Sequence, residues 1–302
     1  MENQLMDVLV RGTAWGGKIR VFAARTTQLV DDHRKRHGTY PTATAALGRT
    51  LTAGVIMGAM LKGDDEKIMI QVKGDGPLGQ IVVDANANGE VRGYVDNPEV
   101  HLPSNTHGKL DVAGAVGRSG NIHITKDLGM KDPYRGSIPI ISGELGEDFT
   151  YYFAVSEQTP SAVGLGVLVD TDNSVLHAGG FIVQLMPGLT DAEITRLEQA
   201  IAKLPPVTAL LDQGETPEGI LSWIVGEEDL VIHDTMSLSR KSGSSRERIE
   251  QTLIALGESE LKQIIEEDGK AEIVDQFSND VHTFDREQLK LLLAQAKPKP
   301  IQ

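Results

Sequence analysis

Two groups of polar residues near the C-terminal end have the spacing of metal ligands. Ser242 and Ser244 are separated by one residue, and Asp275 and Ser278, about thirty positions later, are separated by two. Paired knuckles of this layout hold zinc through cysteine thiolates. The chain contains no cysteine, which also excludes disulfides, iron–sulfur clusters and thiol nucleophiles. Taken alone, these residues predict a serine-rich helix cap and a hairpin turn.

A second candidate site is Ser156–Gln158, which places a hydroxyl, a carboxylate and an amide side by side after the aromatic run Tyr151–Phe153. Such groups can serve in general acid–base catalysis. No G-x-S-x-G nucleophile elbow accompanies them. We therefore expect these side chains to tie the end of a strand, and we keep a small-molecule enzyme as the alternative.

The segment Gly74–Gly79 matches the G-x-G-x-x-G fingerprint of dinucleotide-binding proteins. That fingerprint holds a pyrophosphate because a helix N-terminus follows it. Here the alternating residues 80–84 follow instead, and they indicate a strand. The pattern favours a glycine-rich hairpin over a nucleotide site.

His33 and His37 are four residues apart on an expected helix, which is a spacing of metal ligands. Three basic residues, Arg34, Lys35 and Arg36, lie between them and raise the electrostatic cost of placing a cation there. We expect a solvated basic helix end.

Length and charge limit the classes of partner. A chain of 302 residues suits two domains, or one with appendages. Its formal net charge of −14 disfavours nucleic acid and anionic lipid as general partners. The most apolar run, residues 51–61, is shorter than the roughly 20 residues of a membrane span. Glu2 and Asp7 stand where a signal peptide carries basic charge, so we expect a cytoplasmic protein.

The elements that position these residues alternate along the chain. Hydrophobic spacing predicts helices over 21–37 and from Pro41 to about 62, and period-two alternation predicts strands over 67–72, 80–85 and 91–95. Further strands are expected at 123–126, 149–155, 165–169 and 175–177. The sequence predicts an α+β fold whose N-terminal α/β domain has an antiparallel-rich sheet packed by helices.

Four segments divide the chain. Residues 1–178 are expected to form the N-terminal core and 179–231 a helical linker, in which Thr190 and Glu193 form a capping box and Pro205-Pro206 end a helix. Residues 232–293 are expected to form a small module with helices at 245–256 and 259–267 and a hairpin at 271–284. The tail 294–302 is expected to be disordered.

Several blocks of the sequence together resemble the heat shock protein 33 family of redox-regulated chaperones, over essentially the whole chain. The blocks are Arg34–His37, Pro41, Leu47-Gly48, Leu61–Asp64, Gly74–Pro77, Ala85-Asn86, Arg92–Tyr94, Tyr134–Gly136, Tyr152-Phe153, Ser156–Gln158, Pro160, Ala178–Gly180, Gln184, Pro187, Ser245–Arg248 and Leu256-Gly257.

The resemblance implies an ATP-independent holdase that binds unfolding client proteins, with a metastable linker and a C-terminal zinc and redox switch. It implies no catalysis. In the family, a C-x-C pair and a C-x-x-C pair bind zinc when reduced and form disulfides when oxidised; the corresponding positions here are Ser242, Ser244, Asp275 and Ser278. Serine hydroxyls and one carboxylate cannot replace four thiolates. We therefore expect neither the family's zinc nor its thiol switch in this chain.

The resemblance further suggests a homodimer that exchanges elements across a two-fold axis. We expect client proteins to bind apolar surface that is exposed when the linker loosens from the sheet of the core. Two alternatives remain at this point. One is the small-molecule enzyme with a polar site at Ser156–Gln158, and the other is a scaffold protein descended from the family without chaperone activity.

Overall fold

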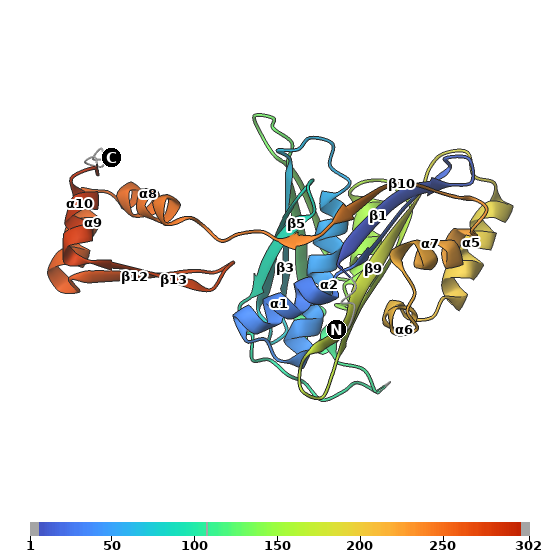
Figure 1. Ribbon diagram of the computed structural model, residues 1–302, viewed down its shortest axis with the longest axis horizontal. Coiled ribbons are helices and arrows are strands. Elements are labelled where there is room, and N and C mark those ends of the chain that lie inside the picture. Colours follow the sequence, from blue (N-terminus) through green and yellow to red (C-terminus); the bar gives the residue numbers. More distant parts are fainter. Residues whose placement is uncertain (1–5, 107, 297–302) are drawn as a thin grey trace. The chain divides into compact units, whose positions relative to one another are not determined.

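The structure, a computed structural model, describes residues 6–106 and 108–296 (Figure 1). The chain divides into two compact units, Met1–Lys241 and Ser242–Gln302, which are described separately. No helix within the described ranges is long and apolar enough to cross a membrane. The α+β class predicted from the sequence is confirmed, because helices and largely antiparallel sheets share each unit.

The first unit contains two sheets. Sheet A is antiparallel, in the order β10 (Leu230–Ser237), β1 (Val8–Ala14), β2 (Ile19–Arg25), β9 (Val175–Leu185) and β8 (Ser161–Val169). Sheet B has the order β11 (Ser239–Arg240), β5 (Glu90–Val95), β4 (Gln80–Asn86), β3 (Lys67–Gly74), β6 (Gly120–Asp127) and β7 (Tyr134–Pro139). The short β11 pairs in parallel with β5, and the other pairs in sheet B are antiparallel.

Helix α2 (Pro41–Gly58) lies between the two sheets and contacts strands of both. Pro41 suits its first turn, and most of its side chains are buried. Gly48 is required by close packing, because a Cβ there would lie 2.6 Å from Cγ1 of Val30. The main hydrophobic core surrounds α2 and takes Leu9 and Phe22 from sheet A together with Ile70 from sheet B.

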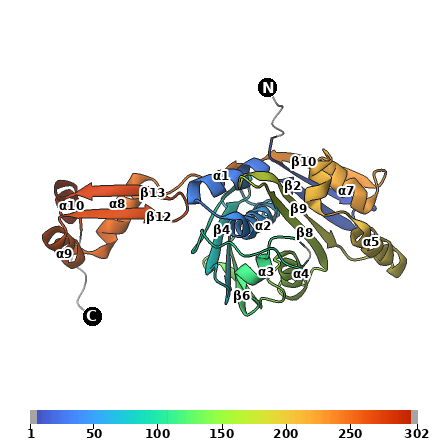
Figure 2. The same ribbon diagram turned by 90° about the horizontal axis from the view of Figure 1, so that it is seen from below.

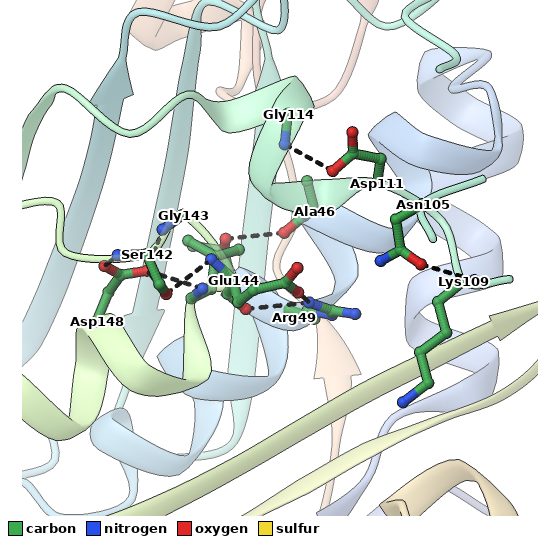
Figure 3. A network of polar contacts seen from close by, with 12 residues as sticks. Ala46, Arg49, Asn105, Lys109, Asp111, Gly114, Ser142, Gly143, Glu144 and Asp148 are labelled. Carbon is green, nitrogen blue, oxygen red and sulfur yellow. Dashed lines mark hydrogen bonds and ion pairs between the residues drawn. The ribbon is translucent and has the colours of Figure 1, made fainter. Parts of the chain in front are cut away.

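The first unit contains three further helices before β8: α1 (Thr27–His37), α3 (Val112–Val116) and α4 (Gly146–Val155). The loop before α4 folds around the buried Asp148, whose carboxylate accepts hydrogen bonds from the backbone N–H groups of Ser142 and Gly143 at 2.9 and 3.0 Å. Figure 3 shows this loop and the adjacent ion pair, in which Arg49 Nη1 lies 2.7 Å from Glu144 Oε2. Asp148 thereby fixes the start of α4.

Helices α5 (Asp191–Lys203), α6 (Val207–Asp212) and α7 (Pro217–Val225) cover the face of sheet A opposite α2 (Figures 1 and 2). We call these three helices the linker helices. Their apolar side chains form a second core with Val10, Ile19, Val21 and Phe181 of the sheet. Sheet A is therefore buried on both faces.

The second unit is small. It contains α8 (Arg246–Leu256), α9 (Glu258–Glu267), β12 (Lys270–Asp275), β13 (Asp280–Asp285) and α10 (Arg286–Leu293). Strands β12 and β13 form an antiparallel hairpin. Its core comprises Ile249, Leu253, Leu261, Ile265, Phe284, Leu289 and Leu292.

Two elements differ from the sequence predictions. The helix expected over 21–37 is instead β2 followed by α1, because residues on both faces of β2 are buried and no two-residue alternation is visible. The strand expected over 149–155 is α4. Its buried aromatic residues Phe149, Tyr152 and Phe153 follow helical spacing.

The structure also places element boundaries differently from the expected segments. Residues 179–185, expected in the linker, belong to β9 and pair with β2. Residues 232–237, expected in the C-terminal module, belong to β10 and pair with β1. Both differences arise because the ends of the linker are strands of sheet A. Of the tail 294–302, residues 297–302 lie outside the described ranges.

Candidate functional site

The structure brings the two C-terminal knuckles together inside the second unit. The backbone N–H of Ser244 donates to Oδ2 of Asp275 at 2.5 Å. A Cβ built on Gly243 would lie 2.4 Å from Oγ of Ser278, so the glycine allows the loops to touch. Asp275 and Ser278 are buried, whereas Ser242 is exposed.

The chemistry of these residues does not fit the zinc ion that the resemblance implies. Asp275 is the one anionic side chain among the four positions, and its carboxylate accepts from Ser244 and, through Oδ1, from the N–H of Phe277 at 2.9 Å. Oγ of Ser278 accepts from the N–H of Asp280 at 3.3 Å. Structural zinc requires four thiolate, imidazole or carboxylate ligands. The hydrogen bond from the Ser244 amide to Asp275 joins the two knuckles here.

A second candidate region is the apolar contact between the linker helices and sheet A. Helix α5 begins at the predicted capping box, in which Thr190 Oγ1 accepts from the N–H of Glu193. Among the described side chains of α5, Leu197 is the buried one, whereas α7 buries Ile220, Leu221 and Ile224. Helix α7 therefore contributes more apolar contact than α5.

A small set of polar contacts holds the linker helices on the sheet. Trp15 Nε1 donates to the carbonyl of Val225 at 2.8 Å, and the guanidinium carbon of Arg196 lies 4.9 Å from the centre of the Trp15 ring. Lys18 Nζ lies 2.8 Å from Oε1 of Glu193. This ion pair, with the hydrogen bonds from Thr190, lowers the pKa of Glu193 to about 2. The Lys18–Glu193 ion pair is partly exposed to solvent, so its contribution to stability is small.

A cavity borders the contact between the linker helices and sheet A. A cavity of about 750 Å³ lies between β8 and the start of α6 and is lined by apolar residues that include Leu165, Val167, Leu204 and Val207. Strand β8 forms the edge of sheet A, and its side chains are partly exposed along most of its length. Apolar surface at an unpaired strand edge is suited to contact with another polypeptide.

Ser156–Gln158 follows α4 rather than a strand. The N–H of Ser156 caps the helix by donating to the carbonyl of Tyr152, and the carbonyl of Ser156 accepts from Oη of Tyr134. Glu157 forms an ion pair with Lys126. Burial raises the pKa of Tyr152. The Ser156 backbone and the Glu157 carboxylate thus hold the end of α4 against sheet B.

The Gly74–Gly79 segment is the hairpin that the sequence predicts. Strands β3 and β4 pair on either side of it, and no helix follows. Its glycines permit close packing on α3, because a Cβ on Gly74 would lie 1.9 Å from the carbonyl oxygen of Val116. The turn lacks the helix N-terminus that would bind phosphate.

The expectation of a solvated helix end is wrong for His33. This residue is buried, and its Nδ1 lies 2.7 Å from the carbonyl oxygen of Leu29. Burial lowers its pKa to about 4, so the ring is neutral near pH 7. It stacks on His37 with ring centroids 6.2 Å apart. In the described residues, no group of three or more His, Cys, Asp or Glu side chains could hold a metal ion.

Trp15 and β10 also take part in the linker contact, although no sequence pattern predicted them there. Trp15 precedes Gly16-Gly17 in the turn between β1 and β2 and takes a positive φ of 53°. A large aromatic residue beside a tight glycine turn was the available signal. Residues 230–237 alternate partly buried and exposed positions, which is a strand pattern that charged neighbours obscured.

Comparison with known proteins gives one consistent family. The sequence model of the Hsp33 protein family matches residues 7–285. A 33 kDa chaperonin of Geobacillus sp. (strain WCH70) is 52% identical over 295 residues, which span 97% of this chain and 100% of that protein. The 33 kDa chaperonin of Bacillus subtilis (strain 168) is 51% identical over 285 residues, spanning 94% of this chain and 97% of the relative.

A solved structure agrees with the sequence comparison. The crystal structure of the 33 kDa chaperonin (heat shock protein 33 homologue) of Thermotoga maritima superposes with a TM-score of 0.90 at 37% identity, covering 96% of this chain and 99% of that one. The match spans the sequences of both units, and the first of these includes the linker helices. Because family model, relatives and fold all span nearly the whole chain, this protein belongs to the Hsp33 family.

Proposed function

We propose that this protein is a molecular chaperone that acts as an ATP-independent holdase: it binds unfolding proteins and prevents their aggregation. Family membership and the chaperonin names of its relatives support the chaperone role. The Gly74–Gly79 hairpin supports independence from nucleotide, because it has no following helix to bind phosphate.

The observation that carries the mechanism is the apolar contact between the linker helices and sheet A. Val10, Val21 and Phe181 of the sheet, and Leu210 and Ile220 of the helices, are buried there. Separation of the helices from the sheet would expose both apolar faces at once. Exposed contiguous apolar surface is what an unfolded polypeptide binds.

The absence of thiols supports a chaperone activity that is constitutive rather than controlled by a redox switch. Ser242, Ser244, Asp275 and Ser278 cannot form disulfides, and their chemistry does not fit zinc. A structural zinc site contributes on the order of 10–16 kcal/mol of apparent binding free energy. In the second unit, hydrogen bonding joins the knuckles instead, so we expect this unit to be marginally stable. A marginally stable second unit would shift the linker helices toward their open, active state.

The partners of the proposed activity are unfolded or partly folded proteins. We further propose that the client-binding state is a homodimer that exchanges linker elements, with Pro205-Pro206 and Gly214 as hinges. Each part would have its own role. Sheet A, which includes residues 179–185 and 232–237, would bind clients, the linker helices would control access to it, and the second unit would set the equilibrium.

Light scattering of a heat-unfolding client protein tests the proposal. An equimolar amount of the chain should suppress scattering equally with and without ATP, and equally after peroxide or dithiothreitol. Bound client should protect from hydrogen exchange the amides of β1, β2 and β9, which are the strands that the linker helices cover in the closed state. Undiminished scattering for every client tested would contradict the holdase activity, and dependence on ATP would contradict the mechanism.

A further inference from the structure

A cavity of about 460 Å³ lies on the face of sheet A opposite the linker helices, and basic side chains predominate among its charged lining residues. Its lining includes Arg11, Thr13, Arg20, Lys62, His233 and Asp234. Three permanently basic side chains therefore face one carboxylate. The chain as a whole has a formal net charge of −14, so a concentration of positive charge is contrary to its average surface.

The strand register explains how these side chains meet. Arg11 and Thr13 of β1 lie opposite Phe22 and Arg20 of β2, and alternate residues of a strand share a face. This is the face of sheet A that α2 covers, since Phe22 belongs to the core around that helix. Lys62 comes from the segment that follows α2.

Strand β10 completes the cavity through an irregularity. The pairing of β1 with β10 shifts register between Arg11 and Gly12, so His233 has no paired residue on β1. Its Nε2 lies 2.8 Å from Oγ1 of Thr13. Bulges commonly redirect a side chain toward a functional site.

The positive charges are incompletely neutralised. Arg11 Nη2 lies 3.0 Å from Oδ2 of Asp234, and Arg11 Nη1 donates to the carbonyl of Ala59 at 3.5 Å. Arg20 has no ion pair among the described residues; it donates to Oε1 of Gln184 at 3.3 Å and lies over the ring of Phe22.

The surroundings of Arg20 make its charge costly. Burial lowers the pKa of its guanidinium, the nearby Glu157 opposes that shift, and the like charge of Arg11 adds to it. Glu157 is itself paired with Lys126. For Lys62, no side-chain ion pair is found within the described part of the chain.

We propose that this cavity binds a phosphate group, held by the guanidinium groups of Arg11 and Arg20 with Lys62, Thr13 and His233 around it. Guanidinium groups bind phosphate through paired hydrogen bonds, and a phosphate dianion matches an excess of two basic groups better than a carboxylate does. The volume exceeds that of one phosphate ion, and Phe22 and Met60 add apolar wall. The site therefore has room for the organic part of a phosphate ester.

The proposed ligand would join segments that lie far apart in sequence. Arg11 and Arg20 belong to the first two strands, whereas His233 and Asp234 belong to β10, which follows the linker helices. Phosphate would thus link β10 to β1 and β2 through side chains. The site uses no residue of the Gly74–Gly79 turn and does not depend on the proposed chaperone activity.

Isothermal titration calorimetry of the full chain with inorganic phosphate, at constant ionic strength, tests the site. Arg20→Gln should weaken binding at least tenfold, and Asp234→Asn, which removes the competing carboxylate, should strengthen it. Arg135→Gln is the matched control, because Arg135 is an exposed arginine of β7 outside the cavity lining and its loss changes the net charge equally. Thermal unfolding without phosphate verifies that each variant is folded.

Two further arms identify the ligand. Glycerol phosphate distinguishes a phosphate ester from the inorganic ion, and either binding more tightly supports the site while naming its source. Acetate at equal ionic strength should bind at least tenfold more weakly than phosphate. The proposal is overturned if phosphate does not bind, if acetate binds as well, or if Arg20→Gln and Arg135→Gln lose affinity equally.

Discussion

Shortening Ile220 should open the linker helices without unfolding the rest of the protein. Ile220 lies on α7, is fully buried, and contacts the outer face of sheet A within the second core. Replacement of a buried isoleucine by alanine costs about 2–5 kcal/mol, and replacement by valine about 0.5–1.5 kcal/mol. The lost contacts belong to the closed state, so most of this cost should fall on the closed–open equilibrium.

The expected change in population follows from that cost. Each 1.4 kcal/mol changes an equilibrium constant about tenfold. Ile220→Ala should therefore raise the open population by roughly thirtyfold or more, and Ile220→Val by roughly two- to tenfold. If the open state binds clients, aggregation suppression at low chaperone dose should rise in the order wild type, Ile220→Val, Ile220→Ala.

Hydrogen exchange and light scattering together check this order. Amides of α5–α7 should exchange faster in both variants, whereas those of β3, β4 and β6 should keep their protection. Ile124→Ala is the matched control, because Ile124 is equally buried but packs in the core around α2. Faster exchange in the linker helices without better suppression, or equal gains in activity from Ile124→Ala, would refute the reasoning.

Three further predictions concern the switch, a buried carboxylate and assembly. Elemental analysis should find no stoichiometric zinc, and holdase activity should not respond to peroxide or dithiothreitol; one zinc per chain would contradict the conclusion that the four switch positions do not fit zinc. Asp7 is buried and accepts from the N–H of Leu29, and burial raises its pKa to about 6. Because the unfolded carboxyl has a lower pKa, its contribution to stability is full below about pH 4 and is lost as the pH rises through 6. Asp7→Asn should therefore gain stability relative to wild type at pH 7.5 but not at pH 4, which urea unfolding at both pH values measures; an equal difference at both would contradict the assignment. Mass measurement should detect a dimer when client is bound, and a monomer at every concentration would count against exchange of linker elements.

Much of the fold was predictable where a local pattern and the tertiary contacts agree. Strand β3 has one fully buried face of alternating Ile68, Ile70 and Val72, so its period is visible in the sequence. Helix α5 carries its capping box and a single apolar stripe. In both elements, the face that the sequence pattern makes apolar is the face that packs against the rest of the protein.

Prediction from the sequence failed where burial on several sides removed the pattern. Strand β2 is buried by α2 on one face and by the linker helices on the other. The cavity around Arg20 was not visible either, because its side chains come from segments separated by the rest of the unit. Their approach depends on strand register and a bulge, which no local spacing encodes.

The positions of β9 and β10 limit how the linker helices can move. Leu185, the last residue of β9, pairs with Ile19; Ile19 pairs with Ala14; and Ala14 pairs with Leu230, the first residue of β10. Both ends of residues 186–229 therefore lie in one row across sheet A, roughly 14 Å apart at about 4.8 Å per strand.

A free chain of that length would have an end-to-end distance of roughly 35 Å. Pinning both ends lowers the entropy that the segment gains on release, and it keeps the local concentration of the helices at the sheet high after opening. The segment is therefore tethered at both ends rather than free at one end. After the proposed opening, reclosure onto the same chain would be a unimolecular event whose rate does not depend on protein concentration, and a client on the sheet would compete with a tethered ligand.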